Sequence, residues 1–201
     1  MSNLEIEVKF YIPDRKSVRQ RIIDLDARSH GRLFETNLRF ENPQNSLNKH
    51  KALLRLRKDK KATLTYKSSP PESNAEFKIF NELEVEVSQF STMNQILHAL
   101  GFRAVQKYEK WRETLTLEDT HFCLDTMPYG DFLEIEGPKN KIRYFADQLG
   151  LNWEKRILKN YLEIFDILKN HLHLQFKDLT FDNFKTVDID AAQFRQHLEA
   201  G

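Results

Sequence analysis

The sequence contains a single cysteine, Cys123, and no long apolar run among its 201 residues. One cysteine excludes an intrachain disulfide and any metal site built from several thiolates. Apolar segments stay well short of the roughly 20 residues that a membrane-spanning helix needs. The first ten residues, MSNLEIEVKF, also lack the basic and apolar regions of a secretory signal. These absences lead us to expect a cytoplasmic protein with no membrane partner.

A large net charge is also missing, because 31 Lys and Arg residues are nearly balanced by 30 Asp and Glu residues. So small a net charge gives no reason to expect a nucleic-acid partner. The seven histidines are scattered and form no recognisable ligand set, so we assign them to structure or surface. Any function that depends on charge must therefore come from the local arrangement of charged residues.

Alternation of apolar and charged residues is the main pattern that is present. In residues 4–10, LEIEVKF, the apolar side chains take one parity and Glu5, Glu7 and Lys9 take the other. Such alternation predicts a β-strand with one apolar and one charged face. Similar patterns predict strands at residues 33–41, 53–57, 63–67, 79–87, 120–126 and 132–137, with one strand or two within residues 102–117.

Helices are predicted between these strands. Residues 13–14, Pro-Asp, precede a helical stripe, and Ser91 is expected to cap a helix that ends at Gly101. Pro138 suits the first turn of a helix that runs to about residue 149. Residues 152–170 are predicted to be helical as well.

The charges on the predicted strands are sorted by sign. One strand presents Glu82, Glu84 and Glu86, whereas another presents Arg55 and Arg57. Like charges two residues apart on a strand repel each other unless opposite charges lie between them. Strands that converge on a common interior would supply those opposite charges. We therefore predict a closed β-barrel with a polar, charged lumen, whose apolar outer faces are covered by the helices.

A lumen with both signs of charge indicates the kind of ligand it binds. Arginine and lysine suit phosphate oxygens, whereas carboxylates suit hard divalent cations. Because carboxylates do not bind phosphate directly, the two sets predict a chain of phosphates bridged to the protein through Mg²⁺ or Mn²⁺. The alternative is an internal salt-bridge network with no ligand, which is costly to assemble for stability alone.

The ordered motifs of these segments carry a family resemblance. Glu5-x-Glu7-x-Lys9 resembles the ExExK signature of the CYTH superfamily, also called the triphosphate tunnel metalloenzymes. The similarity continues through ETNLRFE, LRLR, TLTYKS, ELEVEV, QKYEKWRE and FCLDTMPYGDFLEIEGP to the region of Lys159. It implies an α+β fold in which eight antiparallel strands form a closed tunnel with helices outside.

The resemblance also implies a division of the chain and a set of site residues. It implies a CYTH domain over residues 1–170. The tail, residues 171–201, lies outside the resemblance, and its aromatic residues Phe176, Phe181, Phe184 and Phe194 lead us to expect that it packs on the same domain, as a lid or a homodimer contact. The implied metal ligands are Glu5, Glu7, Glu84, Asp125, Glu134 and Glu136. The implied triphosphate-binding cations are Lys9, Arg55, Arg57, Lys67, Lys110 and Arg112. The implied catalytic residues are Glu5, Glu7, Lys9 and Lys159. Asn160 departs from the family pattern, in which Ser often follows that lysine.

Two reactions fit a member of this family. The first is metal-dependent hydrolysis of an inorganic or organic triphosphate, such as tripolyphosphate, ATP or thiamine triphosphate. The second is the reaction of a class IV-like adenylyl cyclase, which converts ATP to cyclic AMP and pyrophosphate. Family cyclases tend to carry a different motif in place of ETNLRFE, which favours hydrolysis. A module that binds phosphate without catalysis is a third interpretation.

Overall fold

The structure is a computed structural model that describes residues 4–70 and 74–189. Within these residues the chain forms eight strands: β1 (Leu4–Tyr11), β2 (Arg28–Glu41), β3 (Ala52–Lys58), β4 (Ala62–Ser68), β5 (Lys78–Val87), β6 (Arg103–Leu117), β7 (Thr120–Met127) and β8 (Gly130–Glu136). The helices of the same residues are α1 (Arg15–Asp24), α2 (Ser46–Lys49), α3 (Phe90–Ala99), α4 (Lys139–Gln148), the 3₁₀ helix η1 (Trp153–Lys155) and α5 (Tyr161–His171). No helix in the described ranges is long and apolar enough to cross a membrane.

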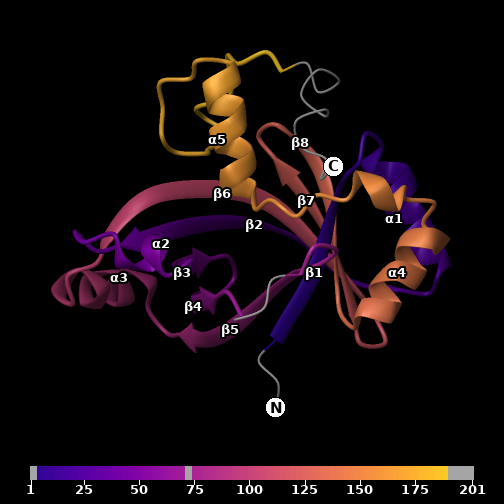
Figure 1. The fold of residues 1–201 in the computed structure, drawn as a ribbon, viewed down its shortest axis with the longest axis horizontal. Coiled ribbons are helices and arrows are strands. Elements are labelled where there is room, and N and C mark those ends of the chain that lie inside the picture. The colour runs from indigo at the N-terminus through magenta and orange to yellow at the C-terminus, as the bar shows by residue number, and fades with distance from the viewer. Residues whose placement is uncertain (1–3, 71–73, 190–201) are drawn as a thin grey trace.

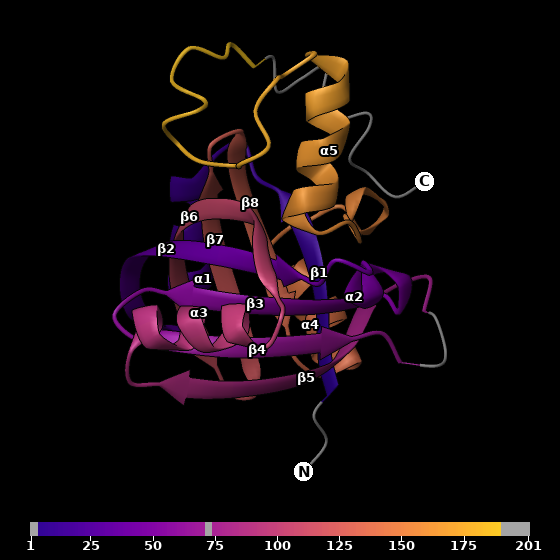
Figure 2. The same cartoon turned by 90° about the vertical axis from the view of Figure 1, so that its left-hand side faces the viewer.

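The strands close into one ring in the order β1-β5-β4-β3-β2-β6-β7-β8, and β8 returns to pair with β1. Every pairing in the ring is antiparallel. Figures 1 and 2 show the ring from two sides, with the helices outside it. The predicted α+β fold with eight antiparallel strands in a closed ring is therefore confirmed.

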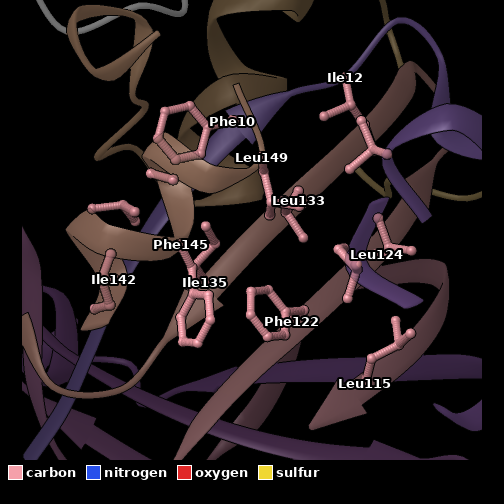
Figure 3. Close-up of a cluster of buried hydrophobic side chains, with 14 of the residues drawn as sticks. Phe10, Ile12, Leu115, Phe122, Leu124, Leu133, Ile135, Ile142, Phe145 and Leu149 are labelled. Atoms are coloured by element: carbon pink, nitrogen blue, oxygen red, sulfur yellow. The ribbon is translucent and has the colours of Figure 1, made fainter. Parts of the chain in front are cut away.

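The largest apolar core lies outside the ring, between the strands and two helices. Apolar side chains of β1, β7 and β8 pack there against α1 and α4 (Figure 3). Helix α4 contributes Ile142 and, three and four residues later, Phe145 and Ala146. This spacing places the three side chains on one face of the helix. Burying a large apolar side chain of this kind stabilises the fold by about 1.5–3 kcal/mol. The polar side chains, which alternate with these apolar ones along the same strands, therefore face the interior of the ring.

Two smaller apolar clusters complete the outer layer. One joins α3 to β2 and β3 through residues such as Phe40, Leu56 and Leu97. The other joins α5 to β8 and to the segment that follows α5, with Phe165, Leu179 and Phe184 among its members. Leu179 also exchanges backbone hydrogen bonds with β6. The division at residue 170 stays a prediction, and residues 190–201, with Phe194 among them, lie outside the described part of the chain.

Three expectations need correction. Helix α3 begins at Phe90 with Gln89 as its N-cap residue, so Ser91 lies inside the helix and does not cap it. Residues 152–170 do not form one helix, because residue 157 pairs with β1 and α5 begins only at Tyr161. The outer face of β5 is not fully covered by helices, since Leu83 and Val85 remain more than half exposed. Residues 103–117, in contrast, form one long strand, which was one of the two options.

Candidate active site in the ring interior

A cavity of about 1090 Å³ occupies the interior of the ring. Side chains from all eight strands and from the start of α5 line it. Most of the predicted site residues are brought together there: Glu5, Glu7, Lys9, Arg55, Arg57, Lys67, Glu84, Lys110, Arg112, Glu134 and Glu136. Strand parity explains this result, because alternate residues of each strand point to the same face.

The lining charges are distributed in two sectors of the ring. We call the inward faces of β8, β1 and β5 the acidic sector, in which six carboxylates outnumber the lysines Lys9 and Lys78: Glu134, Glu136, Glu5, Glu7, Glu82 and Glu84. We call the inward faces of β4, β3, β2 and β6 the basic sector, which presents Lys67, Arg55, Arg57, Arg39, Lys110 and Arg112. A ligand inside the ring therefore meets mostly carboxylates on one side and mostly cations on the other.

Where the two sectors meet at β7, the charged side chains form a buried network. Glu134 accepts hydrogen bonds from Lys9, at 2.5 Å between Nζ and Oε1, and from Arg112. Burial raises the pKa of Glu134, but Lys9 and Arg112 together hold it well below its usual value. Tyr161, at the start of α5, places its ring 4.2 Å from the Lys9 Nζ atom. The network fixes Lys9 and Arg112 at the surface of the cavity.

Asp125 occupies a different position from the one expected. It is fully buried and is absent from the cavity lining in the described residues. Its carboxylate accepts hydrogen bonds from Lys110 Nζ at 3.0 Å, Arg112 Nε at 2.7 Å and the Tyr161 hydroxyl at 2.8 Å. Asp125 therefore lies behind two of the cations and positions them, whereas the sequence predicted a metal ligand.

The arginines of β3 make looser contacts. Arg55 reaches Thr65 Oγ1 at 3.2 Å and Glu84 at 3.8 Å. Arg57 lies 3.4 Å from both Glu84 and Asp59. Contacts of this length are weaker than those of the buried network, so both guanidinium groups retain capacity to bind an anion. Glu84, predicted as a supporting metal ligand, contacts these arginines instead.

Negative charge is in excess where β1 meets β8. Glu7 and Glu136 are direct partners in the β1–β8 pairing. Burial, with Glu7 and Glu82 nearby, raises the pKa of Glu5 to about 8 although Lys67 contacts it. Burial and Glu7 also raise the pKa of Glu136. Glu7 differs because Lys78, 2.9 Å away, holds its pKa at about 2 despite burial. The raised pKa values of Glu5 and Glu136 therefore reflect burial and the crowding of carboxylates at this place in the ring.

A divalent cation fits this excess of carboxylate oxygens. Among the residues that the structure describes, no three His, Cys, Asp or Glu side chains are arranged as a ready-made metal cage. Mg²⁺ does not need such a cage, because it usually binds one or two carboxylates together with waters and substrate phosphates. Glu5, Glu7 and Glu136 offer these ligands beside the cations that would hold the phosphates.

Some lining residues were missed in the sequence. Glu35 and Arg39 follow the inward parity of the second predicted strand, and Lys78 extends the parity of the fifth strand by one step. Parity alone would have found all three. Tyr161 lies within residues 152–170, for which the sequence predicts only a helix, and the folded chain brings it to Lys9 and Asp125.

Further differences concern the lysine of the tail region and two histidines. Lys159 is not part of the cavity lining in the described chain, whereas its neighbours Asn160 and Tyr161 are. His30 and His121, which the sequence assigned to structure or surface, line the cavity. His121 is the direct partner of Glu136 across β7 and β8. His121 shares the parity of Cys123 in the predicted strand 120–126, whereas His30 lies at a shift in the register between β2 and β6 that the sequence does not reveal.

Comparisons with known proteins agree with this architecture. The chain is similar to a candidate adenylate cyclase of Methanocaldococcus jannaschii, with 27% identity over 173 residues, 80% of this chain and 98% of that protein. A solved structure from Pyrococcus horikoshii is 30% identical, covers 78% of this chain and 96% of its own, and has a TM-score of 0.66. A candidate adenylyl cyclase from Hippeastrum, described as having a dominant triphosphatase activity, is 20% identical over 73% of this chain and 88% of its own, with a TM-score of 0.54.

The family model of the CYTH domain matches residues 3–147. That range contains all eight strands of the ring and every charged residue of the two sectors. The expected resemblance is therefore confirmed, and the chain belongs to the CYTH domain family.

Proposed function

We propose that this protein is a metal-dependent triphosphatase that binds a triphosphate inside the ring and hydrolyses its terminal phosphate. The observation that carries the proposal is the placement of a basic and an acidic sector around one cavity. A triphosphate carries its negative charge along a chain, so it needs several cations at once. The basic sector supplies them from four neighbouring strands.

The cations and the carboxylates of the cavity have different roles in the proposed reaction. Arg55, Arg57, Lys67, Lys110 and Arg112 bind the phosphate oxygens and offset the charge that develops in the transition state. Glu5, Glu7 and Glu136 would hold Mg²⁺ or Mn²⁺, which acts as a Lewis acid on phosphate oxygens when it is bound. Fixed cations such as Lys110 need little reorganisation during the reaction, because Asp125 already orients them.

A second candidate is an adenylyl cyclase, because the relative from Methanocaldococcus jannaschii carries that name. In that reaction a ribose hydroxyl attacks the α-phosphorus and pyrophosphate leaves. The same cavity would bind the phosphates in both reactions. The resemblance to the family implies that cyclases tend to carry another motif in place of ETNLRFE, which lies on β2, and this supports hydrolysis as the first candidate.

The products of three substrates separate these functions. The protein is incubated with Mg²⁺ or Mn²⁺ and, separately, with tripolyphosphate, ATP and thiamine triphosphate. We expect metal-dependent release of orthophosphate from at least one of them, with pyrophosphate as the second product from tripolyphosphate. Cyclic AMP and pyrophosphate from ATP, without hydrolysis of any triphosphate, would instead establish the cyclase. Binding without turnover of all three would leave a phosphate-binding module.

Metal binding is expected to release protons at neutral pH. Because the pKa of Glu5 is raised to about 8, this group is mostly protonated at pH 7 and must lose its proton to bind a metal. Calorimetry with Mn²⁺ in two buffers of different ionisation enthalpy should show release close to one proton per metal from Glu5. Release should fall toward zero near pH 9, and equal release at both pH values would contradict the assignment.

A further inference from the structure

Glu35 places a negative charge among the cations that are expected to bind phosphate. It lies on β2, and among the described cavity-lining residues of β2, β3, β4 and β6 it alone carries a carboxylate. Its direct partners in the ring include Lys110 of β6. The side chain is almost fully buried, with 4% of its surface exposed. A negative group in the basic sector repels the phosphate chain that this sector is expected to bind.

The hydrogen bonding of Glu35 is incomplete. Lys110 Nζ lies 3.7 Å from Oε2, which is an ion pair but too long for a hydrogen bond. In the part of the chain that the structure describes, this buried oxygen has no hydrogen-bond partner. Glu134 and Glu7, by comparison, each accept a hydrogen bond from a lysine. Glu35 therefore lines the cavity and carries a buried carboxylate oxygen whose capacity to accept a hydrogen bond is unused.

The charge state of Glu35 defines what it can accept. Burial raises its pKa, but Lys110, Arg112, Arg57 and Arg55 together lower it to about 2. The group is therefore ionised at neutral pH and acts only as an acceptor. Fully ionised phosphate oxygens carry no hydrogen to donate. A water molecule or a hydroxyl group does, and either can attack phosphorus.

We propose that Glu35 is a catalytic residue that accepts a hydrogen bond from the attacking O–H group and directs its oxygen at the phosphorus. This inference rests on the proposed triphosphatase activity, in which the attacking group is water. The geometry that carries it is an unpartnered carboxylate oxygen among the cations that would hold the phosphates. Orienting the nucleophile is a substantial contribution in phosphoryl transfer, where the protein acts mainly by positioning and charge.

The bonds and charges of the step balance without another reactant. The water oxygen forms a bond to the terminal phosphorus, and the bridging P–O bond breaks with its electron pair left on pyrophosphate. Both water hydrogens leave with orthophosphate, so tripolyphosphate and water give pyrophosphate and dihydrogen phosphate. Glu35 accepts a hydrogen bond during the attack and ends the step ionised, as it began.

The test is the Glu35→Gln variant, which keeps the size of the side chain and removes its charge. We expect kcat for the hydrolysed substrate to fall about 100-fold or more. KM should stay unchanged or decrease, because a negative charge beside the phosphates is lost. Tripolyphosphate binding to the metal-free protein, measured by calorimetry, should likewise be as tight as in the wild type or tighter.

Glu113→Gln is the matched control, since Glu113 is a buried carboxylate of β6 whose partners Arg15 and Arg19 belong to α1 outside the ring. It should lower thermal stability and leave kcat unchanged. Glu35→Asp serves as a second variant if Glu35→Gln does not fold. It keeps the charge but withdraws the carboxylate, so kcat should fall while KM is preserved.

Other outcomes would overturn the inference. If Glu35→Gln raises KM with kcat unchanged, Glu35 only holds Lys110 in place. If the wild type forms cyclic AMP instead of hydrolysing triphosphates, the proposed function fails, but Glu35→Gln should still lower kcat because the attacking ribose hydroxyl needs the same acceptor. If the wild type binds triphosphates and converts none of them, both the function and the role of Glu35 are wrong.

Discussion

Replacing Asp125 by Asn is expected to destabilise the protein by about 3–5 kcal/mol, the usual effect of breaking a buried ion pair from one side. Asp125 is fully buried and accepts hydrogen bonds from Lys110, Arg112 and Tyr161. The amide group of Asn turns one of its two acceptors into a donor and removes the negative charge. Lys110 and Arg112 would then face each other in the interior without that charge between them.

The same substitution is expected to lower kcat/KM for tripolyphosphate by about 100-fold or more, because the two cations lose the group that orients them. Chemical denaturation gives the stability change, and steady-state kinetics at a temperature where the variant is folded gives the activity. Asp147→Asn, on the exposed face of α4, is the control and should change stability by less than about 0.5 kcal/mol. If Asp125→Asn loses less than about 1 kcal/mol and keeps its activity, the buried network does not position the cations.

The inward-facing residues could be predicted from the sequence because parity is a local property. In residues 4–10 every second residue is apolar, so Glu5, Glu7 and Lys9 had to share a face. The sorting of charges by sign then indicated that these faces meet. The apolar residues lie outside the ring, as expected, with Val8 and Phe10 in the core beneath the outer helices.

The partners of each charge could not be predicted, because they depend on the register between strands. Lys9 and Glu134 are direct neighbours across β1 and β8, although 125 residues separate them. Asp125 has the same parity as the lining residues Cys123 and His121, so the sequence placed it in the cavity. Arg112 and Tyr161 contact its carboxylate in the folded chain, and no local pattern encodes that arrangement.

The predicted start of the last helix was wrong because two local signals in the sequence competed. Residues 152–170 have apolar spacing typical of a helix throughout, so the sequence predicted one continuous helix and not a start at Tyr161. Asn160 and Glu163 form a capping box that marks this start, and both residues are readable in the sequence. The coverage of β5 is a different matter, because parity predicts that Leu83 and Val85 point outward but gives no information on which element covers them.

Replacing Glu5 by Gln is expected to reduce metal-dependent hydrolysis by at least about 100-fold, with much less effect on stability. A metal ligand lost outright should cost more than the 10–100-fold typical of residues that only support one. The fold should tolerate the change at pH 7, because a pKa of about 8 means that Glu5 is already mostly protonated there. A neutral Gln side chain then resembles the group it replaces.

The pH dependence of stability gives an independent check in metal-free protein. The pKa of Glu5 is higher in the folded protein than in an unfolded chain, so the folded state binds the extra proton between about pH 4.5 and pH 8. Glu5 therefore favours folding at low pH, and its contribution declines as the pH rises through that range. Glu5→Gln should remove this part of the decline and be more stable than the wild type at pH 9.

Glu86→Gln is the control for Glu5→Gln, because Glu86 has the inward parity of β5 but pairs with Lys61 in an exposed position outside the cavity lining of the described chain. It should leave Mn²⁺ binding, hydrolysis and the pH profile unchanged. If Glu5→Gln instead unfolds at pH 7 while Glu86→Gln does not, Glu5 is needed as the ion-pair partner of Lys67. The carboxylates of β1 would then serve to balance the lysines beside them, and the excess of negative charge that supports a metal site would not exist.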